Sequence, residues 1–360
     1  MVDTDAFLSA LSMLFSSGTP WLIVVPGILI GLVFGAIPGL QISMAMAIFL
    51  PMTLYMDFMQ AMLFLTAIFT GGSFGGAIPA ILMNIPGTSS CISTAFDGYP
   101  MSRRGEHNLA LGIALGASCA GVIIGYSLLL LLIEPISKLV LKVGPAEMAV
   151  VILWGITLIG GLSSGNLVRG IISGLIGLLV GTIGYSEAGV TRGTFGSDYL
   201  LDGVPVIPAM IGMFAASELF KLVNKGYLVE DSEKRNVSAK RIFSGFLSVV
   251  RHPVVVLRGS LIGVLIGSIP GVGSSVSNLV SYMVTKRRDK DPESFGKGNP
   301  TGVVASESAN STSEAGSMAT LLALGIPGGG ATAVMLGAFA MHNITGGPQF
   351  IREETDIVYA

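Results

Sequence analysis

The sequence has little charge, and cysteine, histidine and tryptophan are scarce. Asp, Glu, Lys and Arg make up only 12% of its 360 residues, against about 25% in an ordinary soluble domain. The histidines, His107, His252 and His342, are far apart and lack metal-ligand spacing, so no metal site is expected. Cys91 and Cys119 lie in apolar or small-residue surroundings, which predicts two buried thiols and no disulfide. No basic, aromatic-interleaved face is present, so nucleic-acid binding is not expected.

Apolar sequence is abundant instead. Hydrophobic residues make up 51% of the chain, and the mean hydropathy is +0.75. Several runs exceed the roughly 18 apolar residues that span a bilayer, among them residues 108–133, 203–223 and 255–284. The sequence therefore predicts an all-α polytopic membrane protein. Glycine, at 49 residues, is about twice as frequent as usual, which is typical of membrane helices that pack closely or break.

The tripeptide Ile-Pro-Gly occurs four times inside apolar segments, at residues 37–39, 85–87, 269–271 and 326–328. Proline removes a backbone donor and glycine tolerates positive φ, so each copy is expected to stop a helix and let the chain restart. In a bilayer such breaks are tolerated only where protein buries them or where they line a wet cavity. Residues of N-cap type follow three of the breaks: Gln41 with Ser43, Thr88 to Ser90, and Ser274 with Ser275.

A half-helix that restarts at such a break presents free N–H groups and the positive end of its dipole, which suits an anion. We therefore expect the breaks to form a substrate site, although kinks that serve packing alone are the alternative. The candidate substrate-binding residues are Gly39, Gly87, Thr88, Ser89, Ser90, Gly271, Gly273, Ser274, Ser275, Asn310 and Gly328. No Lys or Arg lies in the broken segments, so backbone N–H, hydroxyl and amide groups would hold the anion.

A neutral site for an anion implies that a co-transported cation offsets part of the charge. The coupling-ion candidates are Glu307, Asn278 and Asp97, with Na⁺ or H⁺ as the ion and no other cofactor. For Asp97 a structural alternative is favoured, because Asp97-Gly98 before Tyr99-Pro100 is turn chemistry. The polar stretch DGYPMSRRGEHN around it is expected to form a loop.

The chain contains an internal repeat. Gly31-x-x-x-Gly35-x-Ile37-Pro38-Gly39 matches Gly263-x-x-x-Gly267-x-Ile269-Pro270-Gly271 at an offset of 232 residues. Basic residues follow the first break only in copy two and the second break only in copy one, so the copies are expected to have inverted topology. Paired broken helices in inverted repeats are typical of secondary transporters. The expected division is a first transmembrane repeat at 20–223, a basic cytoplasmic linker at 224–251 and an incomplete second repeat at 252–360.

Three stretches of sequence resemble the large membrane subunit of the tripartite tricarboxylate transporters. They are GAIPG, GGSFGGAIPAILMNIPGTSSCISTAFDGYPMSRRGE and FGKGNPTGVVASESANSTSEAGSMATLLALGIPGG, within a similarity over most of residues 20–350. The resemblance implies a multi-pass protein of the bacterial inner membrane that works with a small membrane subunit and a periplasmic solute-binding protein. It implies uptake of small carboxylates such as citrate, driven by an ion gradient. Family members are longer, which fits an incomplete second repeat.

Two other functions stay open at this point. Inverted repeats also build passive channels. An intramembrane enzyme could use Asp97 or Glu307 as an acid, but no second carboxylate is expected at a pairing distance, and no His or Cys partner is in view.

Overall fold

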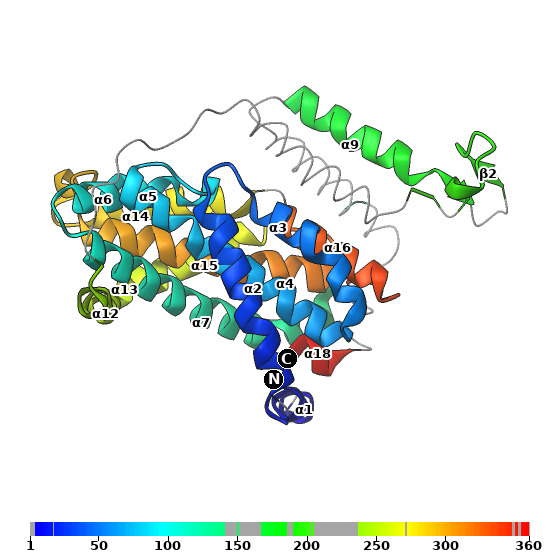
Figure 1. The fold of residues 1–360 in the computed structure, drawn as a ribbon, viewed down its shortest axis with the longest axis horizontal. Coiled ribbons are helices and arrows are strands. Elements are labelled where there is room, and N and C mark those ends of the chain that lie inside the picture. Colours follow the sequence, from blue (N-terminus) through cyan, green and yellow to red (C-terminus); the bar gives the residue numbers. More distant parts are fainter. Residues whose placement is uncertain are drawn as a thin grey trace.

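The computed structural model is a bundle of helices around one central helix, α15 (Pro300–Leu324), shown in orange in Figure 1. It describes residues 4–16, 18–140, 150, 167–185, 190–201, 203–204, 237–270, 272–347, 350–351 and 354–359. The apolar run predicted at 203–223 lies almost wholly outside these residues, as does the first part of the predicted linker.

The described elements follow one another as helices with one small hairpin. The N-terminal part contains α1 (Thr4–Phe15), α2 (Thr19–Ala36), α3 (Ile42–Phe49), η1 (Leu50–Tyr55), α4 (Phe58–Gly75), α5 (Ala77–Met83), η2 (Ser89–Cys91), α6 (Ile92–Arg103) and α7 (His107–Val140). The middle part contains α9 (Leu167–Gly181), the antiparallel strands β1 (Gly184–Tyr185) and β2 (Thr191–Arg192), and η3 (Asp198–Leu200). The C-terminal part contains α12 (Ala239–Ser248), η5 (Val249–Arg251), α13 (Pro253–Gly267), α14 (Gly273–Arg288), η6 (Pro292–Ser294), α15, α16 (Gly330–Met341) and α18 (Thr355–Tyr359).

The predicted helix breaks are confirmed. One helix ends before each Ile-Pro-Gly tripeptide and the next begins after it: α2 and α3, α5 and η2, α13 and α14, and α15 and α16. Among the described residues, three helices are long and apolar enough to cross a membrane: Thr19–Ala36, Phe58–Met83 and His107–Leu132. A fourth span results if α12–η5 and α13, bent by 84° at His252, are taken together. The protein is therefore an all-α membrane protein, as predicted.

The internal repeat is visible in how the two copies pack. In copy one α2 lies along α4, and in copy two α13 lies along α15. Both contacts use three buried glycines at four-residue spacing, namely Gly27, Gly31 and Gly35 on α2 and Gly259, Gly263 and Gly267 on α13. A side chain on Gly31 would meet the backbone of Ile68, and one on Gly263 would meet the backbone of Ala309. Small residues at this spacing let two helix backbones approach closely, so the repeated sequence performs the same packing in both copies.

Contacts between the copies are reciprocal. Helix α3, which follows the first break of copy one, packs on α16, which follows the second break of copy two. Its equivalent in copy two, α14, packs on η2 and α6, which follow the second break of copy one. Each copy therefore contributes the same pair of elements to the interface.

The central helix is polar and yet buried. Every residue of α15 from Gly302 to Ala323 is buried, including Glu307, Asn310 and Glu314. This is possible because α4, α7, α13 and α14 surround the helix and contribute hydroxyl groups and backbone carbonyls. Buried polar groups persist where they find such partners.

One local prediction was wrong. Most of the stretch DGYPMSRRGEHN forms the second half of α6 and the first turn of α7, so it is not a loop. Residues 239–251, at the end of the predicted linker, are helical, and α12 packs on α7. Gly245 of α12 lies directly against the backbone of Leu109 and Gly112 of α7, and this close contact holds the segment to the bundle.

Both cysteines are free, as predicted, with Cys91 buried and Cys119 half-buried.

Gly245→Ala is expected to lower the free energy of unfolding by about 1–3 kcal/mol, because the added methyl group overpacks this contact. Thermal unfolding of the purified protein in detergent measures the change. Gly177→Ala on α9 is the matched control, since a methyl group there meets nothing, and it should be neutral or slightly stabilising. An unfolding temperature for Gly245→Ala as high as that of the control would contradict the close packing of α12 on α7.

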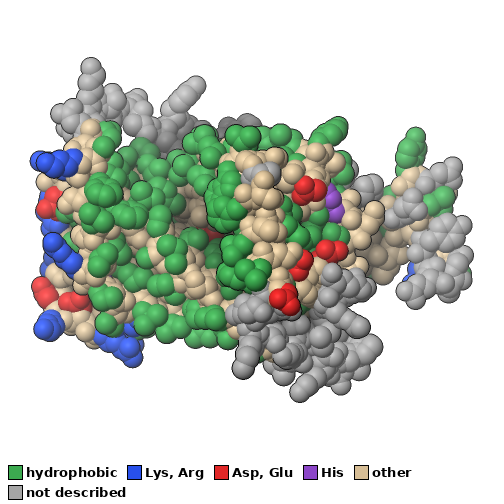
Figure 2. Space-filling model, turned by 90° about the horizontal axis from the view of Figure 1, so that it is seen from below, with side chains coloured by type: hydrophobic (Ala, Val, Ile, Leu, Met, Phe, Trp, Pro, Cys, Tyr) green, Lys and Arg blue, Asp and Glu red, His purple; other side chains and the backbone are tan. Residues whose placement is uncertain are grey.

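Basic charge is segregated along the bundle. Figure 2 shows Lys and Arg side chains gathered, together with some Asp and Glu, at the end formed by α6, α12 and α14, while Asp, Glu and a histidine lie toward the other end of the visible face. Apolar side chains cover the surface between them. This pattern is that of a protein whose middle lies in lipid and whose ends meet water.

Candidate functional site

One cavity of about 250 Å³ collects residues from all four helix breaks. Six of the predicted substrate-binding residues line it: Thr88, Ser89, Ser90, Gly273, Ser274 and Ser275. The other described lining residues are Gln41, Ile42, Ser43, Phe69, Val272, Ser313, Ser317, Gly329, Gly330, Ala331 and Thr332. None of these described residues is a Lys, Arg, His, Asp or Glu. Breaks that are far apart in the sequence therefore meet at one neutral, hydroxyl-rich place.

Three helices begin at this cavity, and η2 leads from it into α6. The first turns of α3, α14 and α16 each contribute to the lining. The first N–H groups of a helix have no partner within the helix, and its dipole places positive potential there. The helix N-termini thus place partial positive charge at the cavity, although its described lining has no cationic side chain. Such an arrangement fits an anionic ligand.

The polar side chains that directly follow the first two breaks lie in the cavity and do not cap the next helix. Gln41 and Thr88 occupy the N-cap positions of α3 and η2, but neither makes a side-chain cap bond. Thr88 Oγ1 instead lies 2.8 Å from Ser90 Oγ. Ser89 Oγ lies 2.7 Å from Ser275 Oγ, which joins the second break to the third and so joins the two repeats.

Of the predicted glycines, Gly273 lines the cavity, whereas Gly39, Gly87 and Gly328 shape the breaks and are not part of the lining. Gly39 has a φ of +96°, a left-handed conformation that favours glycine. A side chain on Gly87 would meet the backbone of α2, and one on Gly328 would meet Ser317. Gly271 lies outside the described residues. Contact of these glycines with substrate stays a prediction.

Glu307 and Asn310 lie one turn apart in the core of α15, outside the cavity lining. The Glu307 carboxylate accepts hydrogen bonds from the hydroxyls of Thr94 and Ser118, the latter at 3.0 Å. Asn310 Nδ2 donates to the Ser73 carbonyl of α4 at 3.3 Å. Both oxygens of Glu307 are therefore occupied by donors from α6 and α7.

Asn278 is a fully buried amide on α14, and neither of its amide atoms has a hydrogen-bond partner among the described residues. Nearby, Ser277 and Ser281 donate to the carbonyls of Ala309 and Ala305 at 3.4 and 2.7 Å, which ties α14 to α15. An unpaired buried amide is costly unless something binds it. A coupling-ion role for Asn278 stays a prediction.

Asp97 clamps α6 to the loop that precedes α15. Its Oδ1 accepts the N–H groups of Gly296, Gly298 and Asn299 at 2.9, 2.8 and 2.8 Å, and its Oδ2 accepts the hydroxyl of Tyr282 at 2.9 Å. The residue is fully buried and lies inside a helix, so the predicted turn is wrong. These tertiary bonds override the local turn preference of Asp-Gly. With four donors on it, the carboxylate is committed to structure.

The basic side chain of Arg104 completes the clamp. Its guanidinium donates to the carbonyls of Lys297 and Gly298 at 2.9 and 2.7 Å and pairs with Glu106 at 3.0 Å. The same loop is therefore held through its N–H groups by Asp97 of α6 and through its carbonyls by Arg104, which follows α6 directly. This clamp joins the first repeat to the second at the basic end of the bundle.

Sequence reasoning missed several residues of the site. Ser313 and Ser317 line the cavity from successive turns of α15, and Thr332 follows the fourth break. Outside the cavity lining, Glu314 was also overlooked, and nothing in its local sequence singles it out. It is seven residues after Glu307, on the same helix face but about 10 Å further along the axis.

Comparison with known proteins identifies the family. A sequence model of the tripartite tricarboxylate transporter TctA family matches residues 21–360. The chain belongs to this family. The resemblance seen in the sequence is thereby confirmed.

Two proteins of Agrobacterium vitis are similar to this TctA-family chain. An uncharacterised 52.8 kDa protein of the TAR-I ttuC′ 3′ region is 34% identical over 335 residues, which cover 91% of this chain and 65% of the relative. An uncharacterised protein of the TAR-II ttuC′ 3′ region is 42% identical over 96 residues, 27% of this chain and 38% of that protein. The chain thus spans about two thirds of the length of the first relative. No solved structure matches it.

Proposed function

We propose that the protein is the membrane carrier subunit of a secondary transporter that takes up small carboxylates, tricarboxylates or dicarboxylates such as citrate, with a co-transported cation. The observation that carries this proposal is the convergence of all four helix breaks on one neutral cavity. Family membership supports transport as the activity.

The cavity supports an anionic substrate of small size. Three helix N-termini and the hydroxyls of Ser43, Thr88, Ser89, Ser274 and Ser275 offer donors to carboxylate oxygens. Its volume of about 250 Å³ is below the roughly 300–1,000 Å³ typical of sites for drug-sized ligands. Binding without a fixed cationic side chain is weak enough to let the substrate leave on the other side.

The arrangement of the copies supports alternating access between inverted repeats. The reciprocal contacts of α3 with α16 and of α14 with α6 are those expected of two copies related by a two-fold axis. The cavity lies where these contacts meet, as in transporters whose site is at the repeat interface. The end that carries α6, α12 and α14 is basic and is proposed to face the cytoplasm.

The proposed setting is the bacterial inner membrane, where the chain acts as a multi-pass subunit. The proposed partners are a small membrane subunit and a periplasmic solute-binding protein that delivers the carboxylate. These follow from the tripartite organisation of the family. The charge segregation and the apolar middle of the bundle are consistent with this setting.

The test is uptake by proteoliposomes that contain the complete transporter and a labelled carboxylate, with the solute-binding protein outside. We expect accumulation above the external concentration only when an inward Na⁺ or H⁺ gradient is imposed. Equilibration without accumulation, whatever the gradient, would indicate a passive channel. Turnover of a labelled lipid or peptide would indicate an enzyme, and either result would overturn the proposal.

A further inference from the structure

Two buried acceptors on α15 have no donor. Asn310 Oδ1 and Glu314 Oε1 belong to side chains that are at most 1% exposed, and neither atom has a hydrogen-bond partner among the described residues. The two residues are four positions apart, so their side chains lie on the same face of successive helical turns. An unpaired buried acceptor costs about 1–3 kcal/mol, so two adjacent ones point to something that binds there.

Other oxygen atoms surround this pair. Thr70 Oγ1 of α4 donates to the other oxygen of Glu314 at 2.8 Å, and the side chain of Ser73 contacts the same carboxylate. The amide nitrogen of Asn310 is held by the Ser73 carbonyl at 3.3 Å and lies 3.7 Å from the sulfur of Cys91, which leaves its oxygen free. Oxygen-bearing groups from α4 therefore contact both Asn310 and Glu314 of α15.

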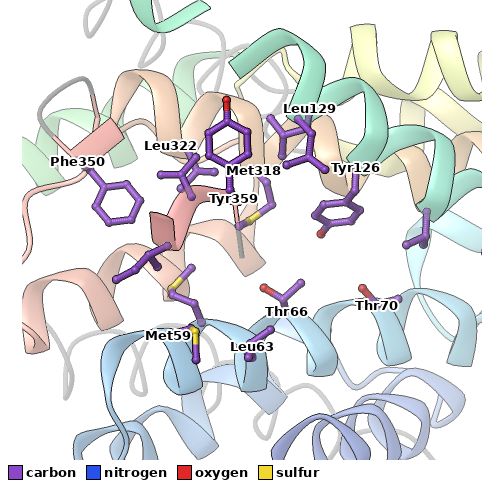
Figure 3. Close-up of a pocket in the computed structure, with 15 residues that line it drawn as sticks. Met59, Leu63, Thr66, Thr70, Tyr126, Leu129, Met318, Leu322, Phe350 and Tyr359 are labelled. Carbon is purple, nitrogen blue, oxygen red and sulfur yellow. The ribbon is translucent and has the colours of Figure 1, made fainter. Parts of the chain in front are cut away.

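A third helix contributes a hydroxyl. Tyr126 of α7 lies beside Thr70, and its buried hydroxyl makes no hydrogen bond of ordinary geometry with the described residues. Figure 3 shows the hydroxyls of Tyr126, Thr66 and Thr70 facing one another across a second cavity of about 380 Å³. The cavity is otherwise mostly apolar, lined by residues such as Leu63, Leu129 and Met318.

Glu314 stands in the wall between the two cavities. Phe69 of α4 and Ser313 of α15 line the neutral substrate cavity, whereas their chain neighbours Thr70 and Glu314 are joined by the hydrogen bond that faces the second cavity. Glu314 is therefore the chain neighbour of Ser313, which lines the cavity proposed to hold the substrate.

No positively charged side chain among the described residues neutralises the Glu314 carboxylate. No described Lys or Arg forms an ion pair with it, and the charged or titratable groups close to it are Glu307 on its own helix, Tyr126 from α7 and Cys91 from η2. An unpaired carboxylate in a low-dielectric interior is strongly unfavourable, so the group needs a proton or a bound cation. Glu307, by contrast, receives donors on both oxygens.

We infer that Glu314, Asn310, Ser73 and Thr70 form a site for a monovalent cation, Na⁺ or the proton, that couples to substrate binding across the α4–α15 wall. This site deepens the proposed function and rests on it. The bound cation offsets the charge of Glu314 and part of the charge of the carboxylate substrate. Binding of the cation and binding of the substrate therefore favour each other.

The experiment compares the wild type with Glu314→Gln in proteoliposomes of the complete transporter. One assay measures accumulation under an imposed Na⁺ gradient or an imposed pH gradient, and the other measures exchange of labelled for unlabelled substrate without any gradient. Glu314→Gln keeps the shape but loses the charge, so accumulation should fall by about tenfold or more while exchange stays near the wild-type rate. The gradient to which the wild type responds identifies the cation.

Glu293→Gln, an exposed residue of η6, is the matched control and should behave as the wild type in both assays. Glu314→Asp restores the carboxylate and should recover part of the gradient response. Accumulation by Glu314→Gln with the wild-type ion dependence would overturn the inference, as would the loss of exchange together with accumulation in a well-folded variant. A wild type that accumulates substrate under neither gradient would instead refute the proposed function itself.

Discussion

Uptake should be abolished when Ser89 and Ser274 are both replaced by leucine. The two serines line the substrate cavity from different repeats, and Ser89 lies 2.7 Å from Ser275. Leucine removes two hydroxyl donors and fills the space in front of the α14 N-terminus. We expect the uptake rate at low substrate concentration to fall by roughly 100-fold or more, equivalent to about 3 kcal/mol of binding free energy. Proteoliposome uptake of a labelled carboxylate measures it.

The matched control places the same substitutions at Ser12 and Ser173, which are exposed on α1 and α9. That double variant should insert into the membrane and transport as the wild type does. The cavity variant should also insert normally and elute as the wild type in size-exclusion chromatography. Unchanged transport in the cavity variant would show that the substrate does not bind at this cavity.

Asp97→Ala should strongly destabilise the basic end of the bundle. Alanine leaves four donors without their acceptor: the buried N–H of Gly298 and hydroxyl of Tyr282, and the partly buried N–H groups of Gly296 and Asn299. The loss should reach about 3 kcal/mol or more, because each orphaned buried donor costs about 1–3 kcal/mol. Thermal unfolding in detergent measures it, and Asp97→Asn, which keeps one carbonyl oxygen, should fall between alanine and the wild type.

Glu106→Ala tests a nearby charge that is exposed. Its pair with Arg104 is about half exposed on both sides, so its removal should cost only about 0–1 kcal/mol. Equal unfolding temperatures for Asp97→Ala and Glu106→Ala would contradict the clamp. Preserved stability with loss of gradient coupling in Asp97→Asn would instead favour the coupling-ion role that the sequence suggested for this residue.

The helix breaks could be predicted from the sequence because their cause is local. Proline and glycine together disfavour the continuation of a helix, and each of the four Ile-Pro-Gly tripeptides marks a break, although Pro26-Gly27 lies inside α2. The hydroxyls of Thr88, Ser89, Ser274 and Ser275 could be assigned to the site because they follow those breaks directly. Composition and the long apolar runs also predicted the class of the fold, since such runs have few alternatives to membrane helices.

The remaining features depend on contacts between distant segments, which local patterns do not contain. Asp97 looks like a turn residue until the loop at Gly296 to Asn299 binds it. Residues 239–251 look like a linker because their charge is local, whereas their packing on α7 depends on Gly245. Ser313 and Glu314 are unremarkable in sequence, and their roles follow from the position of α4 beside them.

The polar character of α15 also constrains how the protein is made. At 25 residues the helix is long enough to cross a bilayer, yet it is not among the described spans that are apolar enough to do so alone. Glu307, Asn310 and Glu314 would each be expensive to expose to lipid. Because α4 and α7 precede α15 in the chain and supply hydroxyl groups to its carboxylates, we expect α15 to enter the membrane by docking onto these helices once they are inserted.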